Sequence, residues 1–165
     1  MEVLVRPARK GEGAAILTVH RRAIHEIARA DYPQEVLDAW GTPISDADLT
    51  QKGADFDRKV ENGEIVIVAE INGCIAGFGE IIPAKCELLA VYVSPDFKRR
   101  GVGRAILCEL ERIAGERSVP YLQMDSSLTA EPFYLANGYR TVERGFHTLR
   151  NGQTMACVKM RKDLA

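Results

Sequence analysis

The sequence predicts an α/β fold with a mixed sheet, and three observations support that prediction. Along the 165 residues, short runs rich in β-branched side chains alternate with longer segments of helical periodicity. The pair Asn72-Gly73 separates two of these runs and favours the positive φ angles of a tight antiparallel hairpin. A further run, residues 87–93, leads through a basic glycine loop into an amphipathic helix.

The chain is expected to begin with one strand and one long helix. Residues 2–6 form the strand, and Pro7 ends it before a polar turn. Over residues 14–30, apolar side chains recur at steps of three and four, which is the spacing of one helix face. Pro33 then interrupts the helical pattern.

Two further helices are predicted before the next strand. Residues 33–40 form a short helix, because proline is accepted in its first turn and Gly41 can end it. Residues 45–63 form a second helix with Ser45 as its cap, and Gly53 is expected to weaken it.

Three strands follow one another in the middle of the chain. Residues 64–71 are the strongest strand signal, since β-branched residues dominate them. The Asn-Gly pair then returns the chain as an antiparallel strand over residues 74–82, and a short turn leads to a strand over residues 87–93. From Val102 the pattern predicts a helix of about four turns.

The C-terminal part is predicted to add three strands and one helix. Residues 121–125 resemble a buried strand, and residues 129–137 form a short helix. From Tyr139 onward the chain forms a last hairpin that turns at Asn151-Gly152.

Length and composition are those of a single globular domain over residues 1–165. Hydrophobic residues make up 46% and charged residues 27% of the chain, close to the average for folded domains. Intrinsic disorder is therefore a poor fit. No internal repeat or low-complexity linker marks a domain boundary.

Charge and hydropathy argue against several partners and locations. The 22 Lys and Arg residues balance 23 Asp and Glu residues, so no global positive field attracts nucleic acid or an anionic membrane. No apolar run approaches the roughly 20 residues that a membrane-spanning helix needs, and the first residues do not resemble a signal peptide. We therefore expect a cytoplasmic protein that binds neither nucleic acid nor membrane.

The four cysteines predict neither a metal site nor a disulfide framework. They are widely separated, and none lies in a CxxC pair. We expect reduced thiols packed in the protein interior, at Cys74, Cys86, Cys108 and Cys157.

The loop KRRGVG, residues 98–103, is the strongest candidate for a ligand site. It follows a strand and opens a helix, so unpaired backbone N–H groups and the positive end of the helix dipole meet there. Gly101 and Gly103 allow an anion to approach the main chain closely. The loop lacks the third glycine of GxGxxG, and the chain contains no GxxxxGK[ST] motif. A diphosphate is therefore expected, rather than a dinucleotide or a nucleoside triphosphate.

Two motifs resemble those of the GNAT superfamily of acetyl-CoA-dependent N-acetyltransferases. The segment LAVYVSPDFKRRGVGRAILCEL is similar to its acyl-CoA-binding motif, an apolar strand, V-x-P and then Q/R-x-x-G-x-G/A, with Lys98 at the Q/R position. Downstream, AEPFYLANGY matches the family pattern A-x-x-F-Y-x-x-x-G-F/Y. The phrase AIHEIARADYPQEVLDAW also looks like an uncharacterised bacterial subgroup. The resemblance implies a mixed, mostly antiparallel twisted sheet of about seven strands flanked by about four helices.

The resemblance also implies where acetyl-CoA binds. Pantetheine would pair with the backbone of Val91 and Val93, and the Val93 N–H would polarise the thioester carbonyl. The diphosphate would lie on the amides of residues 99–104, and no metal ion would be needed. The cofactor-binding residues expected on this basis are Val91, Tyr92, Val93, Lys98, Arg99, Arg100, Gly101, Val102, Gly103, Arg104, Ser127 and Phe133.

Two catalytic roles follow from the same resemblance. Tyr134 would give a hydrogen bond or a proton to the departing thiolate. Glu87 would deprotonate the amine, often through water, and Glu80 is the alternative base. Either glutamate could instead be a solvated carboxylate on an exposed strand face. Other expected pocket or packing residues are His20, His25, Tyr32 and Trp40.

The function implied is an acyltransferase that moves acetyl from acetyl-CoA directly to a primary amine of a small molecule in a ternary complex. Two alternatives stay open: a peptide or protein N-acetyltransferase, and a non-catalytic acyl-CoA-binding module. The sequence does not select the acceptor. It also leaves the oligomeric state open, and a homodimer paired through the last strands is one alternative.

Overall fold

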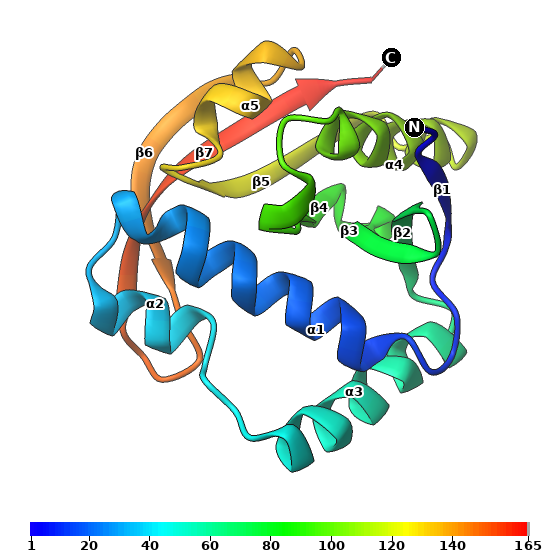
Figure 1. The fold of residues 1–165 in the computed structure, drawn as a ribbon. Helices are drawn as coiled ribbons and strands as arrows, with labels where there is room; N and C mark the ends of the chain where they lie inside the picture. Colours follow the sequence, from blue (N-terminus) through cyan, green and yellow to red (C-terminus); the bar gives the residue numbers. More distant parts are fainter. Residues whose placement is uncertain (165) are drawn as a thin grey trace.

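A seven-stranded sheet organises the structure, a computed structural model that describes residues 1–164. The strand order is β1-β2-β3-β4-β5-β7-β6, and every neighbouring pair is antiparallel except β4 and β5. This arrangement confirms the mixed, mostly antiparallel sheet (Figure 1). The strands are β1 (Leu4–Pro7), β2 (Ile65–Ile71), β3 (Cys74–Ile82), β4 (Glu87–Val93), β5 (Tyr121–Ser127), β6 (Arg140–Thr148) and β7 (Thr154–Asp163).

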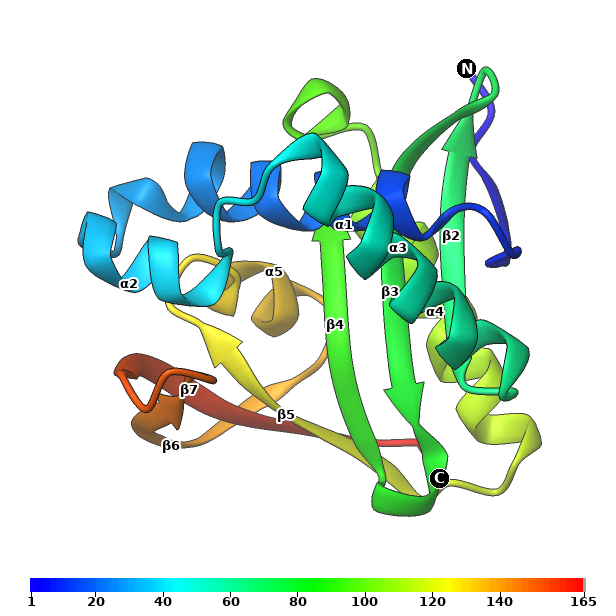
Figure 2. The same cartoon turned by 90° about the horizontal axis from the view of Figure 1, so that it is seen from below.

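Within residues 1–164, five α-helices flank the sheet, one more than the resemblance implied. Helices α1 and α3 pack together, and α1 lies on β3 and β4. Helix α4 packs on β2 and β3 from the opposite face (Figures 1 and 2). The helices are α1 (Gly13–Arg22), α2 (Gln34–Trp40), α3 (Asp46–Glu61), α4 (Val102–Glu116) and α5 (Glu131–Ala136). No helix within residues 1–164 is both long and apolar enough to cross a bilayer.

Strand β2 is buried on both faces, because helices cover both sides of the sheet. Val66 and Val68 pack with Ile16 of α1, whereas Ile67 belongs to the larger core under α4. A strand covered in this way needs apolar residues at successive positions. This explains why the run EIVIVAEI was the strongest strand signal in the sequence.

The predicted hairpins form where the turn residues placed them. Asn72 and Gly73 have φ angles of 50° and 78°, as the tight turn between β2 and β3 requires. Gly152 has φ 85° in the turn between β6 and β7. The left-handed conformation at these positions confirms both turn predictions.

The long N-terminal helix is not regular, which corrects the prediction over residues 14–30. Helix α1 ends at Arg22 and continues as a π-helical turn, η1 (Ala23–Ile27), and a 3₁₀ turn, η2 (Ala28–Ala30). The apolar spacing predicted one continuous helix, because steps of three and four do not distinguish a local π turn.

Several boundaries also differ from those predicted. Strand β1 spans Leu4–Pro7 instead of residues 2–6, so Pro7 is its last residue. Strand β5 continues two residues further, to Ser127, and α5 spans only Glu131–Ala136. Pro7 is accepted because it lies at the end of an edge strand, where proline interrupts few ladder hydrogen bonds.

Ser45 caps α3 as predicted, and Gly53 has a packing role that the sequence did not show. The Ser45 hydroxyl accepts a hydrogen bond from the Asp48 N–H at 3.2 Å. A Cβ on Gly53 would lie 2.7 Å from the Ala14 nitrogen, and one on Gly13 would lie 2.1 Å from the Gly53 oxygen. The glycines therefore allow α1 and α3 to touch through their backbones.

The expectation of packed thiols is wrong for two cysteines. Cys74 is exposed beside the β2–β3 turn, and Cys108 is exposed on α4. Cys86 is partly buried and Cys157 is buried. All four thiols are free.

Candidate active site

Strands β4 and β5 run side by side at one end and then separate. Glu87 lies opposite Gln123, and the Gln123 N–H donates a hydrogen bond to the Cys86 carbonyl at 2.9 Å. Within residues 1–164, this is the one register position that the two strands share. Figure 2 shows β4 and β5 diverging from this point. The rest of β4 therefore lacks a strand partner on that side.

The backbone of β4 has polar groups that face this divergence. Ser94 directly follows β4, and its N–H donates a hydrogen bond to the carbonyl of Ala76 in β3 at 2.8 Å. Because backbone groups alternate in direction along a strand, those of Tyr92 also face β3, and those of Val91 and Val93 face the opposite side. An extended ligand can bind such unpaired groups as an added strand does.

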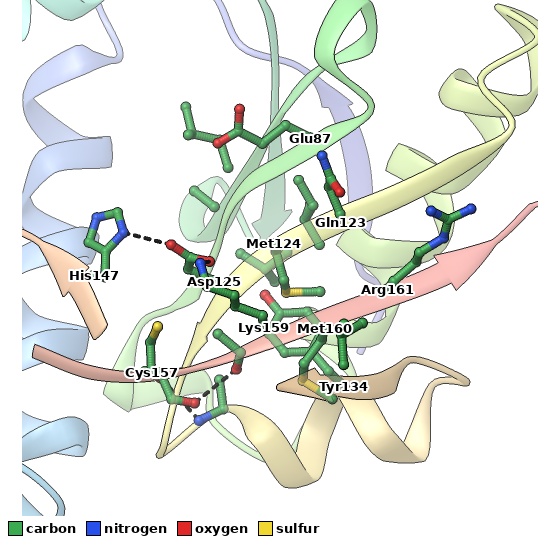
Figure 3. A pocket seen from close by; sticks show the side chains of 18 of the residues that line it. Glu87, Gln123, Met124, Asp125, Tyr134, His147, Cys157, Lys159, Met160 and Arg161 are labelled. Atoms are coloured by element: carbon green, nitrogen blue, oxygen red, sulfur yellow. Dashed lines mark hydrogen bonds and ion pairs between the residues drawn. The ribbon is translucent and has the colours of Figure 1, made fainter. Parts of the chain in front are cut away.

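Two cavities meet at the divergence. One measures about 600 Å³ and is lined mainly by β4, β5 and β7 (Figure 3). The other measures about 220 Å³ and extends toward Gly103 and Phe133. The residues that line both cavities are Trp40, Val91, Tyr92, Ser127 and Ala130. Two ligands that enter from different sides can therefore meet beside β4.

The basic loop lies at the N-terminus of α4. Its N-cap residue, Gly101, has no side chain that could cap the helix, and its first turn contains no acidic residue. Arg99 and Gly101 have φ angles of 60° and 78°, and they lead the chain into the helix at Val102. The first N–H groups of a helix have no partner within it, so they are available to an anion.

The cations of this loop are largely uncompensated. Within residues 1–164, Lys98, Arg99 and Arg104 form no ion pair, and Arg100 contacts only the Met1 sulfur and the Phe97 ring. Lys98, Arg99 and Arg100 are exposed. The loop therefore combines free backbone donors with positive charge, which suits a diphosphate.

Tyr134 lies on α5 at the wall of the larger cavity. Its ring is packed edge-on against Phe133 and Tyr139, with centroids 5.0 and 5.5 Å away. Burial raises the pKa of Tyr134, so its hydroxyl stays protonated at neutral pH. A protonated hydroxyl can donate a hydrogen bond or a proton, but it cannot act as a base.

A polar cluster from three strands lines the same cavity. His147 of β6 lies with Nδ1 2.9 Å from an Asp125 carboxylate oxygen, and the Lys159 ammonium of β7 lies 3.1 Å from the other oxygen (Figure 3). Burial opposes the charge on Asp125, but the hydrogen bonds from His147 and Lys159 outweigh it and lower the pKa of Asp125. Asp125 is therefore an anion with both oxygens engaged.

A family model described as an acetyltransferase (GNAT) domain matches residues 28–164. The chain belongs to the GNAT acetyltransferase family. It is 28% identical over 142 residues to the uncharacterised N-acetyltransferase YafP of Escherichia coli K12, a match that covers 86% of this chain and 84% of YafP.

Solved structures have the same GNAT fold. A GCN5-related N-acetyltransferase from Rhodopseudomonas palustris superposes with a TM-score of 0.86 at 26% identity, covering 99% of this chain and 96% of that chain. PaiA N-acetyltransferase from Thermoplasma acidophilum, solved with coenzyme A, superposes with a TM-score of 0.73 at 17% identity and 99% coverage of both chains. The GNAT fold prediction is confirmed.

The GNAT motif residues lie around the two cavities and the loop. Val91, Tyr92 and Val93 line the smaller cavity together with Phe133 and Ser127. Glu87 and Tyr134 line the larger one. The structure thus brings the two predicted motifs together, and the roles given to individual residues stay predictions.

Glu80 is not a solvated carboxylate, which corrects one interpretation of the sequence. Its residue is only 4% exposed, and its carboxylate lies 2.9 Å from the Lys59 ammonium. The ion pair compensates the buried charge, and Glu80 does not line either cavity. Glu87, in contrast, lines the larger cavity and forms no ion pair within residues 1–164.

Ser127 has a structural contact that the sequence did not predict. Its hydroxyl oxygen accepts a hydrogen bond from the Ala130 N–H at 3.1 Å, just before α5. The hydroxyl hydrogen is still available to donate to a ligand. A contact between Ser127 and a pantetheine carbonyl therefore stays compatible with this geometry.

The aromatic and histidine candidates of the N-terminal third differ in role. Trp40 lines both cavities, and its indole N–H donates to the Tyr92 hydroxyl at 3.1 Å. Tyr32 has a structural role, because its hydroxyl donates a hydrogen bond to the Ala156 carbonyl and accepts one from the Leu128 N–H. The Nε2 atom of His25 lies 2.5 Å from the carbonyl oxygen of Gly41, within hydrogen-bond distance.

His20 packs edge-on against Tyr92, with ring centroids 4.6 Å apart. Burial, together with the positive charges of Arg150 and Arg21, lowers the pKa of His20 to about 4. It is therefore a neutral packing residue at neutral pH.

Sequence reasoning missed the cluster of Asp125, His147 and Lys159. These residues are distant in the sequence, and the antiparallel pairing of β5, β7 and β6 brings them together. The alternation of side chains along β5 was a partial indication that Asp125 faces away from the core. Leu122, Met124 and Ser126 are buried, and the residues between them face the other side of the sheet.

Proposed function

We propose that this GNAT protein transfers the acetyl group of acetyl-CoA directly to a primary amine of a small molecule in a ternary complex. The main support for this proposal is the divergence of β4 and β5, because two cavities meet there beside unpaired backbone groups. A thioester and an amine could enter from different sides and react without a covalent enzyme intermediate.

Acetyl-CoA binds along β4 and at the start of α4 in this proposal. The diphosphate lies on the amides of residues 99–104, with nearby Lys98 adding charge. The backbone of Val91 and Val93 pairs with the pantetheine amides, and the Val93 N–H polarises the thioester carbonyl. Coenzyme A bound to PaiA of the same fold supports this choice of ligand.

The transfer needs a base to deprotonate the ammonium and an acid to protonate the leaving sulfur. An alkylammonium, with a pKa near 10.4, is not a nucleophile until it loses a proton. The sulfur of coenzyme A, whose thiol has a pKa near 8.5, leaves more easily when it receives a proton as the C–S bond breaks. Glu87 is the proposed base, acting directly or through water. Tyr134 is the proposed acid, and its raised pKa supports a donor role.

Direct transfer is favoured over an acyl-cysteine intermediate. Cys157 lines the larger cavity, but it is 2% exposed, and burial followed by the charge of Asp125 raises its thiol pKa. A protonated thiol is a weak nucleophile. Because side chains can carry each proton transfer, the proposed reaction uses no metal ion.

The size of the larger cavity supports a small amine as the acceptor. Its volume of about 600 Å³ is in the range of small-molecule sites, and Trp40 closes part of its wall. A peptide or protein acceptor is the second candidate. A non-catalytic acyl-CoA-binding role is the third, and the retained position of Tyr134 at the cavity wall argues against it.

A thiol-release screen tests this function. Purified protein and acetyl-CoA are mixed with amines, amino acids, polyamines, aminoglycosides and short peptides, and free thiol is measured. Acceptor-dependent release with a small amine supports the proposal. Release with peptides alone would select the second candidate, and acetyl-CoA binding without acceptor-dependent release would select the third.

A further inference from the structure

The proposed reaction removes two protons from the acceptor nitrogen. An ammonium loses one proton to become a nucleophile, and the nitrogen of the tetrahedral intermediate loses a second to become an amide. Tyr134 supplies a proton to sulfur, but the proposed function names only Glu87 as a base. A second proton acceptor therefore has a defined task.

The geometry of the larger cavity supplies one candidate for that task. His147 lines the cavity, and its Nδ1 lies 2.9 Å from the Asp125 carboxylate. When Nδ1–H donates to this carboxylate, the lone pair of a neutral imidazole is on Nε2. A base held by a third group is the arrangement that activates nucleophiles in many enzymes.

The neighbouring groups are less suited to accept a proton. Both oxygens of Asp125 are engaged by His147 and Lys159, and the pKa of Asp125 is lowered. Lys159 is the other half of that ion pair, and the pKa of Lys159 is raised by its hydrogen bond to Asp125. The remaining titratable groups that line this cavity are Glu87 and Tyr92 from β4, Tyr134 from α5, and Cys157 and Arg161 from β7.

Asp125 lies beyond the register position that β5 shares with β4. Gln123 lies opposite Glu87, and Asp125 follows it by two residues in the parallel strand. Two residues correspond to about 7 Å along a strand, in the direction of Val91. The His147–Asp125 pair therefore lies further along the cavity wall than the residue opposite Glu87, on the strand that diverges from β4.

We propose that His147 is a second catalytic base and that Asp125 is its positioning residue. This inference rests on the proposed function. After the amine attacks the thioester carbon, Nε2 of His147 accepts the proton from the nitrogen of the intermediate. The C–S bond breaks, sulfur takes the Tyr134 proton, and His147 releases its proton to water while Tyr134 regains one.

Chemical rescue tests the assignment. The variant His147→Ala is assayed for thiol release with acetyl-CoA and the best amine from the screen, with and without a series of substituted imidazoles. We expect turnover to fall by about 10²-fold or more. Added imidazole should restore part of it, because His147 is half-exposed, and the restored rate should rise with the pKa of the imidazole.

Matched variants separate catalysis from folding. Thr148→Ala changes an exposed neighbour on the same strand and should keep the parent rate and show no rescue. Asp125→Asn should lower kcat with little change in acetyl-CoA affinity, and it should alter the pH profile of kcat. His147→Gln serves as a second variant if His147→Ala does not fold, and it should show the same loss of turnover.

The outcomes are distinct. If folded His147 variants keep the parent turnover, or if their loss is not rescued by any imidazole, the inference is overturned while the proposed function stands. If the parent protein releases no thiol with any acceptor, the proposed function fails, and the second base fails with it.

Discussion

Tyr134 and Glu87 differ in environment, and the difference suits opposite tasks. The Tyr134 ring is buried between two aromatic rings, so its hydroxyl keeps its proton. Glu87 is only partly buried and has no cationic partner within residues 1–164. A carboxylate of this kind is free to attract an ammonium group, whereas a buried phenol is a proton donor.

Replacing Tyr134 by phenylalanine removes the donor and keeps the packing. We expect turnover to fall by about 10²-fold, because the thiolate then leaves without a proton. Acetyl-CoA affinity measured by calorimetry should stay close to that of the parent protein. Unchanged turnover would remove Tyr134 from the acid role.

Replacing Glu87 by glutamine removes the proposed first base. The rate should fall most at lower pH, where more of the amine is protonated and deprotonation limits the reaction. The pH profile of kcat/KM checks this expectation. Glu80→Gln is the matched control, since it should lower stability by about 1 kcal/mol or more through the Lys59 pair and leave the pH profile unchanged.

His20 predicts a pH dependence of stability. The pKa of His20 is about 4 in the folded state, below the value near 6.5 expected when the chain unfolds. The unfolded chain therefore binds the proton first, and the free energy of unfolding should decrease as pH falls from about 6.5 to 4, by on the order of 3 kcal/mol in total.

Urea unfolding at several pH values measures this effect. The variant His20→Gln should show a flatter dependence on pH in that window than the parent protein. Equal slopes for the two proteins would contradict the assignment.

At the scale of elements, glycines decide how closely helices approach. In α3, Gly53 lies against the backbone of Ala14, whereas Gly115 near the end of α4 has open space around it. Gly53→Ala should lower the free energy of unfolding by about 1–3 kcal/mol, because its Cβ has no room. Gly115→Ala should raise it by about 0.5–1 kcal/mol through helix propensity.

Urea unfolding of both variants tests the α1–α3 contact. A stabilising effect of Gly53→Ala equal to that of Gly115→Ala would show that the two helices do not meet through Gly53. Acetyl-CoA affinity should change little in either variant, because both positions lie outside the two cavities.

Some elements were predictable because their signals are local. The turn at Asn72-Gly73 depends on positive φ angles that these residues accept easily, and Ser45 caps α3 through its own hydroxyl. The backbone contact of Gly53 depends on packing against a distant segment, and apolar spacing does not distinguish the π turn Ala23–Ile27 from an α-helix. Periodicity and propensity contain no information about such contacts.

At the scale of the whole molecule, the site forms where one parallel pair of strands interrupts an otherwise antiparallel sheet. The motif around Gly101 and the motif around Tyr134 were recognisable in the sequence. The cluster of Asp125, His147 and Lys159 was not, because three strands assemble it. The acceptor, the oligomeric state, the cytoplasmic location and the single-domain assignment stay predictions.

In the proposed complex, acetyl-CoA binds between the loop of residues 98–104 and the diverging strands β4 and β5. Isothermal titration calorimetry of the purified protein with acetyl-CoA tests it most directly. We expect saturable binding of about one molecule per chain, since residues 1–164 contain one such basic loop at the start of α4 beside the divergence of β4 and β5. An absence of binding heat at millimolar acetyl-CoA would contradict it.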